Sequence, residues 1–459
     1  MAATRARLCF CGVEESAAAE IRSALVDAGL DLVSSHEVPQ ESGIVCFSSV
    51  SDELINLLHD FKRSRVPALA VGATPNSLNP RETWRLLHAG AEDTLVWSSD
   101  GSAFGRIKAR LDRWQTIDEL ATDAARRASF IGAGAAWLQL VRRVVEAARF
   151  ADTPVLLIGE SGTGKELLAH LIHIADARAV TQAGSAPDPV TVDCSTIVPE
   201  LSGSELFGHE KGAFTGAIAA RDGAFAAANH GTLFLDEVGE LPVGLQVQLL
   251  RAVQEKTYKR VGGNVWQTTD FRLVSATNRD LADLVARGQF RLDLYHRLAG
   301  WVFRLPALRE RREDILPLAA HFLHECRPDD DPADFDESVR AYLVNREYPG
   351  NVRELRQLIH RIAHRHVGPG PLTAGDIPPD DRPASDELPS SWPDERLDCV
   401  IEDAITRGIG LKEISHATTE AAIRLALHSE KGNLHRAATR LGVTDRALQL
   451  RRASKRAAS

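Results

Sequence analysis

Short apolar runs alternate with longer amphipathic segments along the first 115 residues of the chain. The apolar runs predict strands at 8–11, 30–33, 44–47, 68–71 and 94–96. The amphipathic segments predict helices at 16–28, 52–63, 81–89 and 102–120, and the last one continues as a polar helical linker over 116–128. Strands that alternate with helices form a parallel sheet covered on both faces, so an α/β domain is expected at 1–115.

The same alternation of apolar runs and amphipathic segments resumes after residue 129, and mainly helical patterns and a polar linker follow it. Residues 129–305 predict a second α/β domain, and residues 306–372 predict a helical extension. The segment 373–415 contains a stretch rich in Pro, Asp and Ser and is interpreted as a linker. Helices separated by a Gly-containing turn in residues 416–459 predict an all-α helix-turn-helix domain.

The whole chain is acidic, but its last 40 residues are basic. The formal net charge is -9 over 459 residues, whereas residues 420–459 carry nine Lys or Arg against three acidic residues. This distribution argues against a protein that coats nucleic acid over its whole surface. No run of 18 apolar residues is present, so no membrane span is expected, and six scattered cysteines are interpreted as reduced thiols in the cytoplasm.

A glycine-rich loop directly follows the strand predicted at 155–158. It consists of Gly159, Glu160, Ser161, Gly162, Thr163, Gly164 and Lys165. Backbone N–H groups in such a loop converge on phosphate oxygens, and the lysine adds charge at the β- and γ-phosphates. These residues predict an ATP site. Glu166 stands where Ser or Thr usually follows the lysine, so a hydroxyl ligand to Mg²⁺ is missing there.

Two carboxylates end the strand predicted at 232–235. Asp236 and Glu237 lie at its carboxyl end, where ligands of parallel sheets bind. Asp236 suits Mg²⁺, helped by water, and Glu237 suits orienting or deprotonating the attacking water. A third strand at 271–278 ends at Thr277 and Asn278, which are candidates to sense the γ-phosphate or the water.

The hexapeptide from Gly212 to Ala217 is the most informative segment of the chain. Together with the nucleotide motifs and segments 249–263, 290–298, 305–315 and 348–355, it resembles the AAA+ domain of bacterial sigma-54-dependent transcriptional activators. The resemblance covers about 129–372 and implies an ATPase core with a helical lid. In this family the hexapeptide contacts RNA polymerase that carries sigma-54. The matching residues here are Gly212, Ala213, Phe214, Thr215, Gly216 and Ala217.

The resemblance also assigns three arginines. Arg291 and Arg297 match arginine fingers that reach the ATP of a neighbouring subunit, which makes hydrolysis depend on a ring, expected to be a hexamer. Arg353 matches the sensor on the lid. Phe214 and Thr215 are expected at the exposed tip of the polymerase-contacting loop, because flanking glycines permit a tight turn.

One position departs from the family pattern. Asp193 aligns with an Asn that hydrogen-bonds and restrains the catalytic Glu in the family. An ionised Asp193 cannot donate to Glu237, and the two carboxylates repel each other unless one is protonated. We therefore expect altered coupling between hydrolysis and loop movement.

Both ends resemble modules that accompany this AAA+ domain. Residues 416–459 resemble a Fis-type helix-turn-helix, which implies a palindromic DNA site if two copies pair; the candidate DNA contacts are Arg446, Gln449, Arg451 and Arg452. Residues 1–115 resemble a degenerate response-regulator receiver. Ser48 follows the strand that would end in the phosphoacceptor Asp, and Trp97 stands in place of the receiver's Lys. Phosphotransfer is not expected, and this module is interpreted as serving oligomerisation, partner binding or ligand sensing.

The leading interpretation is an ATP-driven transcription activator that binds an enhancer and opens promoters held by sigma-54 RNA polymerase. Homo-oligomers from dimer to hexamer are implied. One alternative is an AAA+ unfoldase, which the helix-turn-helix and the hexapeptide argue against. Another is a DNA-binding regulator with a silent ATPase, which Asp193 favours slightly but the intact set of Lys165, Asp236, Glu237 and both arginines does not.

Overall fold

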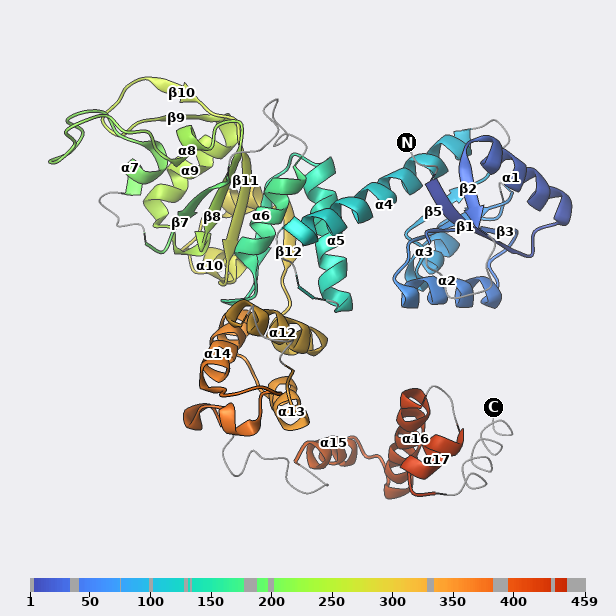
Figure 1. Cartoon of the computed structure of the whole chain (residues 1–459). Helices are drawn as coiled ribbons and strands as arrows, with labels where there is room; N and C mark the ends of the chain where they lie inside the picture. Colours follow the sequence, from blue (N-terminus) through green and yellow to red (C-terminus); the bar gives the residue numbers. More distant parts are fainter. Residues whose placement is uncertain are drawn as a thin grey trace. The chain divides into compact units, whose positions relative to one another are not determined.

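The computed structural model describes residues 4–33, 41–74, 76–98, 102–127, 131–132, 134–176, 188–196, 202–327, 334–382, 395–430 and 434–443. The chain divides into two compact units, 1–378 and 379–459 (Figure 1). Among these described residues, no helix has the length and apolarity needed to cross a membrane.

The first sheet has five parallel strands in the order β2-β1-β3-β4-β5. The strands are β1 (Thr4–Cys11), β2 (Leu30–Val33), β3 (Gly43–Phe47), β4 (Ala68–Gly72) and β5 (Asp93–Val96). The helices are α1 (Glu15–Asp27), α2 (Asp52–Ser64), α3 (Pro80–Ala89) and α4 (Ser102–Arg127). Every residue of β3 and β4 is buried, because apolar runs in the middle of a parallel sheet are covered on both faces. The predicted parallel α/β region is confirmed.

The second sheet is also parallel, with strand order β12-β6-β11-β8-β7. Its strands are β6 (Val155–Ile158), β7 (Val190–Asp193), β8 (Thr232–Asp236), β11 (Arg272–Thr277) and β12 (Trp301–Arg304). A separate antiparallel hairpin pairs β9 (Thr257–Lys259) with β10 (Trp266–Thr268). All strands of a parallel sheet end at one edge, so β6, β7, β8 and β11 bring the four candidate segments of the nucleotide site together.

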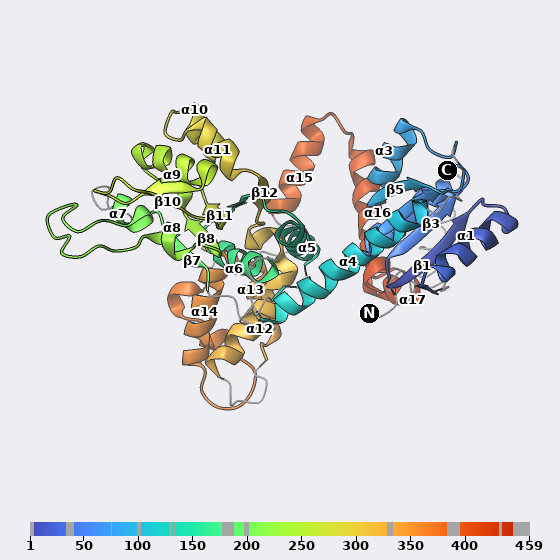
Figure 2. The same ribbon diagram turned by 90° about the horizontal axis from the view of Figure 1, so that it is seen from above.

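Helices cover both faces of the second sheet. One face packs against α5 (Ala135–Phe150) and α6 (Lys165–Ala175), and the other packs against α9 (Val243–Glu255) and α11 (Leu292–Leu298). Shorter helices are α7 (Ser202–Phe207), α8 (Ala224–Ala227) and α10 (Leu281–Ala286). In β6, Val155 and Leu157 face the α5–α6 side while Leu156 faces the other, as the two-residue period of a strand requires. Both views show the segment between α7 and α8 extending away from the sheet (Figures 1 and 2).

Helix α4 takes part in two cores. Its first half contributes Ile107 and Leu111 to the core beside the first sheet. Its second half contributes Ile117 to the core formed with α5 and α6. An ion pair between Arg113 and Glu146, at 2.7 Å, adds to the packing of α4 on α5. The segment predicted as a polar linker is therefore partly a core element.

Three helices form a small core of their own after β12. They are α12 (Ile315–Cys326), α13 (Glu337–Asn345) and α14 (Asn351–Arg365). Buried Tyr348 donates a hydrogen bond from its hydroxyl to the carbonyl of Leu343 at 2.8 Å, which fixes the turn before α14. The helical extension predicted at 306–372 is present, and its turn before α14 delivers residues to the glycine-rich loop.

The second unit contains α15 (Glu395–Thr406), α16 (Leu411–Ser429) and α17 (Leu434–Arg440). Helix α15 lies within the segment interpreted as a linker. Ala437 and Ala438 are buried, and their small side chains permit the close approach of α17 to α16. The third predicted helix and the candidate DNA contacts Arg446, Gln449, Arg451 and Arg452 lie outside the described residues.

Candidate nucleotide site

The glycine-rich loop leaves the end of β6 and enters α6 at Lys165. Gly162 and Gly164 have φ angles of +76° and +105°, a region that disfavours side chains. A Cβ atom on Gly162 would lie 2.3 Å from the carbonyl oxygen of Gly350. Glycine is therefore required at Gly162 both by the backbone conformation and by the approach of the lid.

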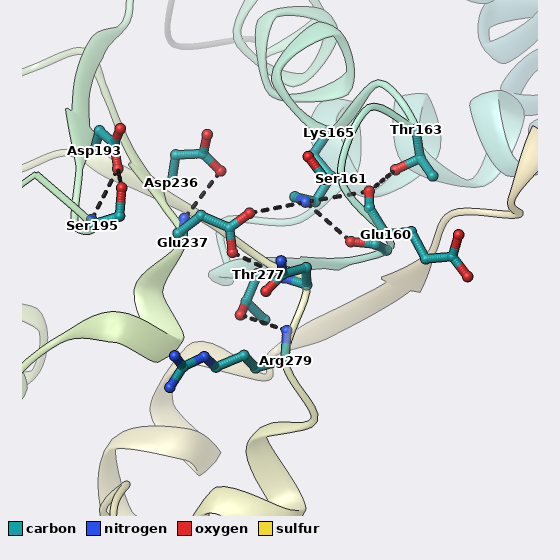
Figure 3. A network of polar contacts seen from close by, with 12 residues as sticks. Glu160, Ser161, Thr163, Lys165, Asp193, Ser195, Asp236, Glu237, Thr277 and Arg279 are labelled. Carbon is teal, nitrogen blue, oxygen red and sulfur yellow. Dashed lines mark hydrogen bonds and ion pairs between the residues drawn. The ribbon is translucent and has the colours of Figure 1, made fainter. Parts of the chain in front are cut away.

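Lys165 is only 7% exposed, although it is charged. Its Nζ donates to the carbonyl of Gly159 at 3.0 Å and forms an ion pair with Glu237 Oε1 at 3.2 Å (Figure 3). The ammonium group is thus held at the mouth of the loop by oxygen atoms. Phosphate oxygens are the same kind of partner, so the site is arranged to receive them.

Glu237 is positioned by contacts with the ends of two neighbouring strands, β8 and β11. It follows Asp236 at the end of β8 with a φ of +49°, and its Oε2 accepts the backbone N–H of Asn278 at 3.0 Å. Asp236 Oδ1 accepts the N–H of Glu237 at 3.0 Å. The left-handed backbone at Glu237 is uncommon for a residue with a side chain and is characteristic of strained functional positions.

Burial raises the pKa of the Asp236 carboxyl, and the negative charges of Glu237 and Asp193 add to that rise. A nearby cation relieves both effects, because it favours the ionised carboxylate. Carboxylate oxygens at a strand end fit Mg²⁺, which usually takes one or two protein carboxylates together with phosphate oxygens and water. Within the described ranges no group of three or more His, Cys, Asp or Glu residues could hold a metal ion by itself. A Mg²⁺ ion that takes most of its ligands from phosphate and water does not need such a group.

The carboxylate of Asp193 bonds to Ser195 and not to Glu237, the carboxylate it was expected to repel. Its Oδ1 accepts the backbone N–H of Ser195 at 2.9 Å and the hydroxyl of the same residue at 2.6 Å (Figure 3). In the sheet register Asp193 is the partner of Asp236. The described hydrogen bonds of Glu237 are instead to Asn278 and Lys165, so the side chains relieve the predicted repulsion by turning apart.

The lid contacts the glycine-rich loop through its first turn. The side-chain amide of Asn351 donates to the carbonyl of Ser161 at 3.0 Å and to Glu160 at 3.1 Å. The backbone N–H of Val352 donates to Gly162 at 3.0 Å. Arg353, the predicted lid sensor, donates to the hydroxyl of Ser161 at 3.3 Å. The structure therefore brings Arg353 to the loop as expected.

Glu160 carries a second link to the lid. Both of its carboxylate oxygens accept hydrogen bonds from the Arg309 guanidinium, at 2.5 and 2.9 Å. These bonds, and the one from Asn351, lower the pKa of Glu160 to about 2. Sequence reasoning did not identify Arg309 or Asn351. Asn351 lies in the matched segment 348–355, so the motif itself was the signal that could have revealed it.

Glu166 and Thr163 have different surroundings, although both belong to the predicted loop region. Glu166 is exposed in the first turn of α6. Thr163 is buried, and its hydroxyl donates to the carbonyl of Glu160 at 2.8 Å. Thr163 therefore stabilises the turn of the loop by an internal hydrogen bond.

The two candidate arginine fingers lie on the surface at α11. Arg291 is the N-cap residue and forms two hydrogen bonds with Asp293, at 3.0 and 2.7 Å. Arg297 is exposed in the last turn of α11, and no partner for it is present in the described part of the chain. Both are accessible to a neighbouring molecule.

The hexapeptide forms the end of the loop between α7 and α8. Gly212 donates its N–H to the carbonyl of Ala217 at 2.8 Å, and Ala217 donates to Phe214 at 3.0 Å, so the tip is a closed turn. Phe214 is half-buried, with its ring edge-on to His209 at a centroid distance of 5.0 Å. Thr215 is exposed. Phe214 lies at the tip of the loop as expected, and the aromatic contact covers part of its ring.

At the carboxyl edge of the first sheet, β1 ends at Cys11 and β3 is followed by Ser48, and neither residue is acidic. The Ser48 hydroxyl donates to the carbonyl of Gly12 at 2.5 Å. Cys11 is buried in the core, and Asp52 opens α2 and pairs with Arg85 at 3.5 Å. Trp97 packs partly against the core. These contacts fit the interpretation of a degenerate receiver.

Comparison with known proteins places the second sheet and the lid in one family. Residues 130–304 match the Sigma-54 interaction domain, and residues 309–391 match the AAA+ ATPase lid domain. Regulatory protein AtoC of Escherichia coli (strain K12) is 41% identical over 303 residues, which cover 65% of this chain and 61% of AtoC. The chain thus spans about three fifths of the length of that relative.

A longer match is found with the anaerobic nitric oxide reductase transcription regulator NorR of Citrobacter koseri. It is 38% identical over 416 residues, which cover 87% of this chain and 75% of that protein. Among solved structures, NtrX from Brucella abortus in complex with ADP has a TM-score of 0.49 at 24% identity, over 97% of this chain and 98% of that one. On the strength of the domain matches and the NorR alignment, this chain belongs to the family of sigma-54-dependent transcriptional regulators.

Proposed function

We propose that this chain is an ATP-dependent bacterial transcription activator of the cytoplasm, which binds enhancer DNA and remodels the closed complex of sigma-54 RNA polymerase. The observation that carries the proposal is that one matched domain, residues 130–304, contains both the carboxylate–lysine site and the hexapeptide loop. Remodelling a partner by hydrolysis requires a nucleotide site and a contact loop in the same domain, and this domain has both.

The residues at the sheet edge supply the chemistry of hydrolysis. In the proposed reaction Lys165 binds the β- and γ-phosphates, and the loop N–H groups hold the remaining oxygens. Glu237 orients the attacking water and accepts its proton, while Asn278 keeps that carboxylate in place through the 3.0 Å bond. Asp236 would hold Mg²⁺, which when bound neutralises charge on the phosphate oxygens.

Hydrolysis in this proposal needs a second subunit. Arg291 at the N-cap of α11 and Arg297 in its last turn are both exposed, so each guanidinium is available to the γ-phosphate of a neighbour. An arginine supplied in trans stabilises transition-state charge and is worth about 10³-fold or more in rate. Activity would therefore depend on a ring, for which we propose a hexamer.

The second unit provides the proposed contact with DNA. Helices α16 and α17 pack closely through Ala437 and Ala438, as in a helix-turn-helix. The basic surplus of residues 420–459 suits binding to phosphates. Two copies that pair would favour a palindromic enhancer.

The test is transcription from a sigma-54 promoter in a purified system, with Thr215→Ala as the variant. We expect open-complex formation to fall at least about tenfold while ATPase activity stays within about twofold, because the exposed Thr215 lies outside the hydrolysis site. Thr268→Ala removes the same groups from an exposed position on β10 and is the matched control.

Three outcomes would contradict the proposal. Full promoter opening by Thr215→Ala would remove the hexapeptide from the mechanism. ATP-driven unfolding of unrelated proteins, without any effect on promoters, would instead support the unfoldase alternative. A chain that binds DNA but never hydrolyses ATP would support the silent regulator.

A further inference from the structure

The side chain of Gln246 is a buried polar group at the junction of two parts of the ATPase domain. It lies on α9 and is 0% exposed. Its Nε2 donates to the carbonyls of Leu241 at 2.8 Å and Gln289 at 3.0 Å, and its Oε1 accepts the backbone N–H of Arg291 at 2.9 Å. One amide therefore satisfies three backbone groups from two separate segments.

The two segments belong to different functional parts of the subunit. Leu241 ends the turn η1 (Val238–Glu240), which directly follows the catalytic candidate Glu237. Gln289 and Arg291 lie at the start of α11, on either side of Phe290, which is 3% exposed in the core. Gln246 thus links two parts of the subunit. One is the turn after Glu237, beside the subunit's own nucleotide site, and the other is Arg291, which is proposed to reach the neighbour's nucleotide.

Only a glutamine meets the demands of this position. Two acceptors and one donor require two N–H groups and one carbonyl oxygen on the same side chain, which an amide provides. A glutamate would keep the acceptor but set a buried carboxylate against two carbonyl oxygens, and a leucine would leave all three backbone groups without partners. The orientation of the amide is fixed by the partners themselves.

Arg291 is held very differently at its two ends. Its backbone is fixed from inside by Gln246, whereas its guanidinium bonds to exposed Asp293 and can exchange that partner for another anion. We infer that Gln246 is a positioning residue for hydrolysis in trans: it sets the base from which Arg291 reaches the neighbouring subunit's nucleotide. This inference rests on the proposed role of Arg291.

The experiment uses mixed assemblies of full-length chains. Glu237→Gln subunits can offer an arginine but cannot hydrolyse ATP, and Arg291→Ala subunits can hydrolyse only with a neighbour's arginine. Mixing the two should restore activity that neither has alone. Adding Gln246→Leu to the Glu237→Gln donor should reduce this rescue about tenfold, whereas adding it to the Arg291→Ala acceptor should change it by less than about twofold.

Matched controls separate positioning from general damage. Gln248→Leu makes the same change at an exposed position of α9 and should leave the donor fully active. In uniform Gln246→Leu assemblies kcat should fall, while the dissociation constant for a fluorescent ATP analogue stays unchanged. If the Leu variant does not fold, Gln246→Glu and Gln246→Met carry out the same comparison.

Equal or greater loss when the substitution is on the acceptor would overturn the inference, since a merely structural defect acts on the subunit's own site. Full rescue by the Gln246→Leu donor would overturn it as well. Failure of the proposed function has a different signature: Arg291→Ala alone would be as active as the unaltered chain.

Discussion

Asn351 shows how one buried residue can connect the lid to the nucleotide loop. It has a φ of +51° and no exposed surface. Its Oδ1 accepts the N–H of Leu308 at 2.8 Å, and its amide donates to Ser161 and Glu160. The start of the lid at Leu308, its helix α14 and the glycine-rich loop thus meet at a single side chain.

We predict that Asn351→Ala and Asn351→Gly both raise the KM for ATP and lower the free energy of unfolding. Each leaves the buried N–H of Leu308 without a partner, at a cost of about 1–3 kcal/mol. The Ala variant should be the less stable by a further ~1 kcal/mol, because glycine tolerates the left-handed backbone. Urea unfolding and ATP titrations measure both quantities. Equal stability of the two variants would show that the backbone at this position relaxes.

Asp193 is the second residue whose effect can be measured directly. It is the register partner of Asp236, and its negative charge helps to raise the pKa of the Asp236 carboxyl. We predict that Asp193→Asn changes the coupling of hydrolysis to promoter opening by about twofold to tenfold, equivalent to about 0.4–1.4 kcal/mol. ATPase and transcription assays on the same preparation give the ratio. Identical values for both activities would show that Asp193 is a neutral replacement.

At the scale of elements, the hexapeptide loop is braced by its neighbouring hairpin. Arg260 precedes the connection between β9 and β10 and pairs with Glu210 on one side of the loop base and Asp222 on the other. The backbone N–H of Glu210 also donates to Val261 at 3.0 Å. These contacts hold the two ends of the loop together while its tip extends.

We therefore predict that Arg260→Gln weakens promoter opening about fivefold with little change in basal ATPase activity. The estimate corresponds to the loss of about 1 kcal/mol from partly exposed ion pairs. Arg287→Gln removes an exposed pair with Asp283 on α10 and is the control for a change of charge. If both variants open promoters equally well, the ion pairs of Arg260 at the loop base do not contribute to promoter opening.

The elements of the first sheet and the strands β6, β8 and β11 of the second could be predicted closely, because buried parallel strands are continuous apolar runs between turns. Strand β2 has the predicted bounds, and β6 does as well. Helix α15 was not separated from the linker, since its amphipathic pattern directly follows a stretch rich in Pro and Ser. The short hairpin β9–β10 has only three residues in each strand and leaves no periodicity to detect.

The site was predictable only where motif and strand order coincide. Lys165, Asp236, Glu237 and Asn278 follow strands that the sheet brings to one edge, and they lie together as expected. The contacts that Glu160 and Gln246 make were not predictable, although Asn351 itself lies in a matched motif. Glu160 bonds to residues 149 and 191 positions away, and no spacing in the sequence encodes such contacts. The half-buried ring of Phe214 depends likewise on the folded turn.

For the whole molecule, the division after residue 378 predicts that two activities can be separated. A chain lacking residues 379–459 keeps every described contact of the nucleotide site. We expect it to retain ATPase activity at high protein concentration but to lose salt-dependent binding to duplex DNA. Gel-shift and ATPase measurements test this. Undiminished DNA binding by the shortened chain would place the DNA contact elsewhere.

The central claim, that hydrolysis requires a neighbour's arginine, is tested most directly by steady-state ATPase activity as a function of protein concentration. We expect activity per subunit that rises cooperatively with concentration and disappears in Glu237→Gln, because the site is complete only between subunits. Activity per subunit that is independent of concentration down to monomer would contradict it.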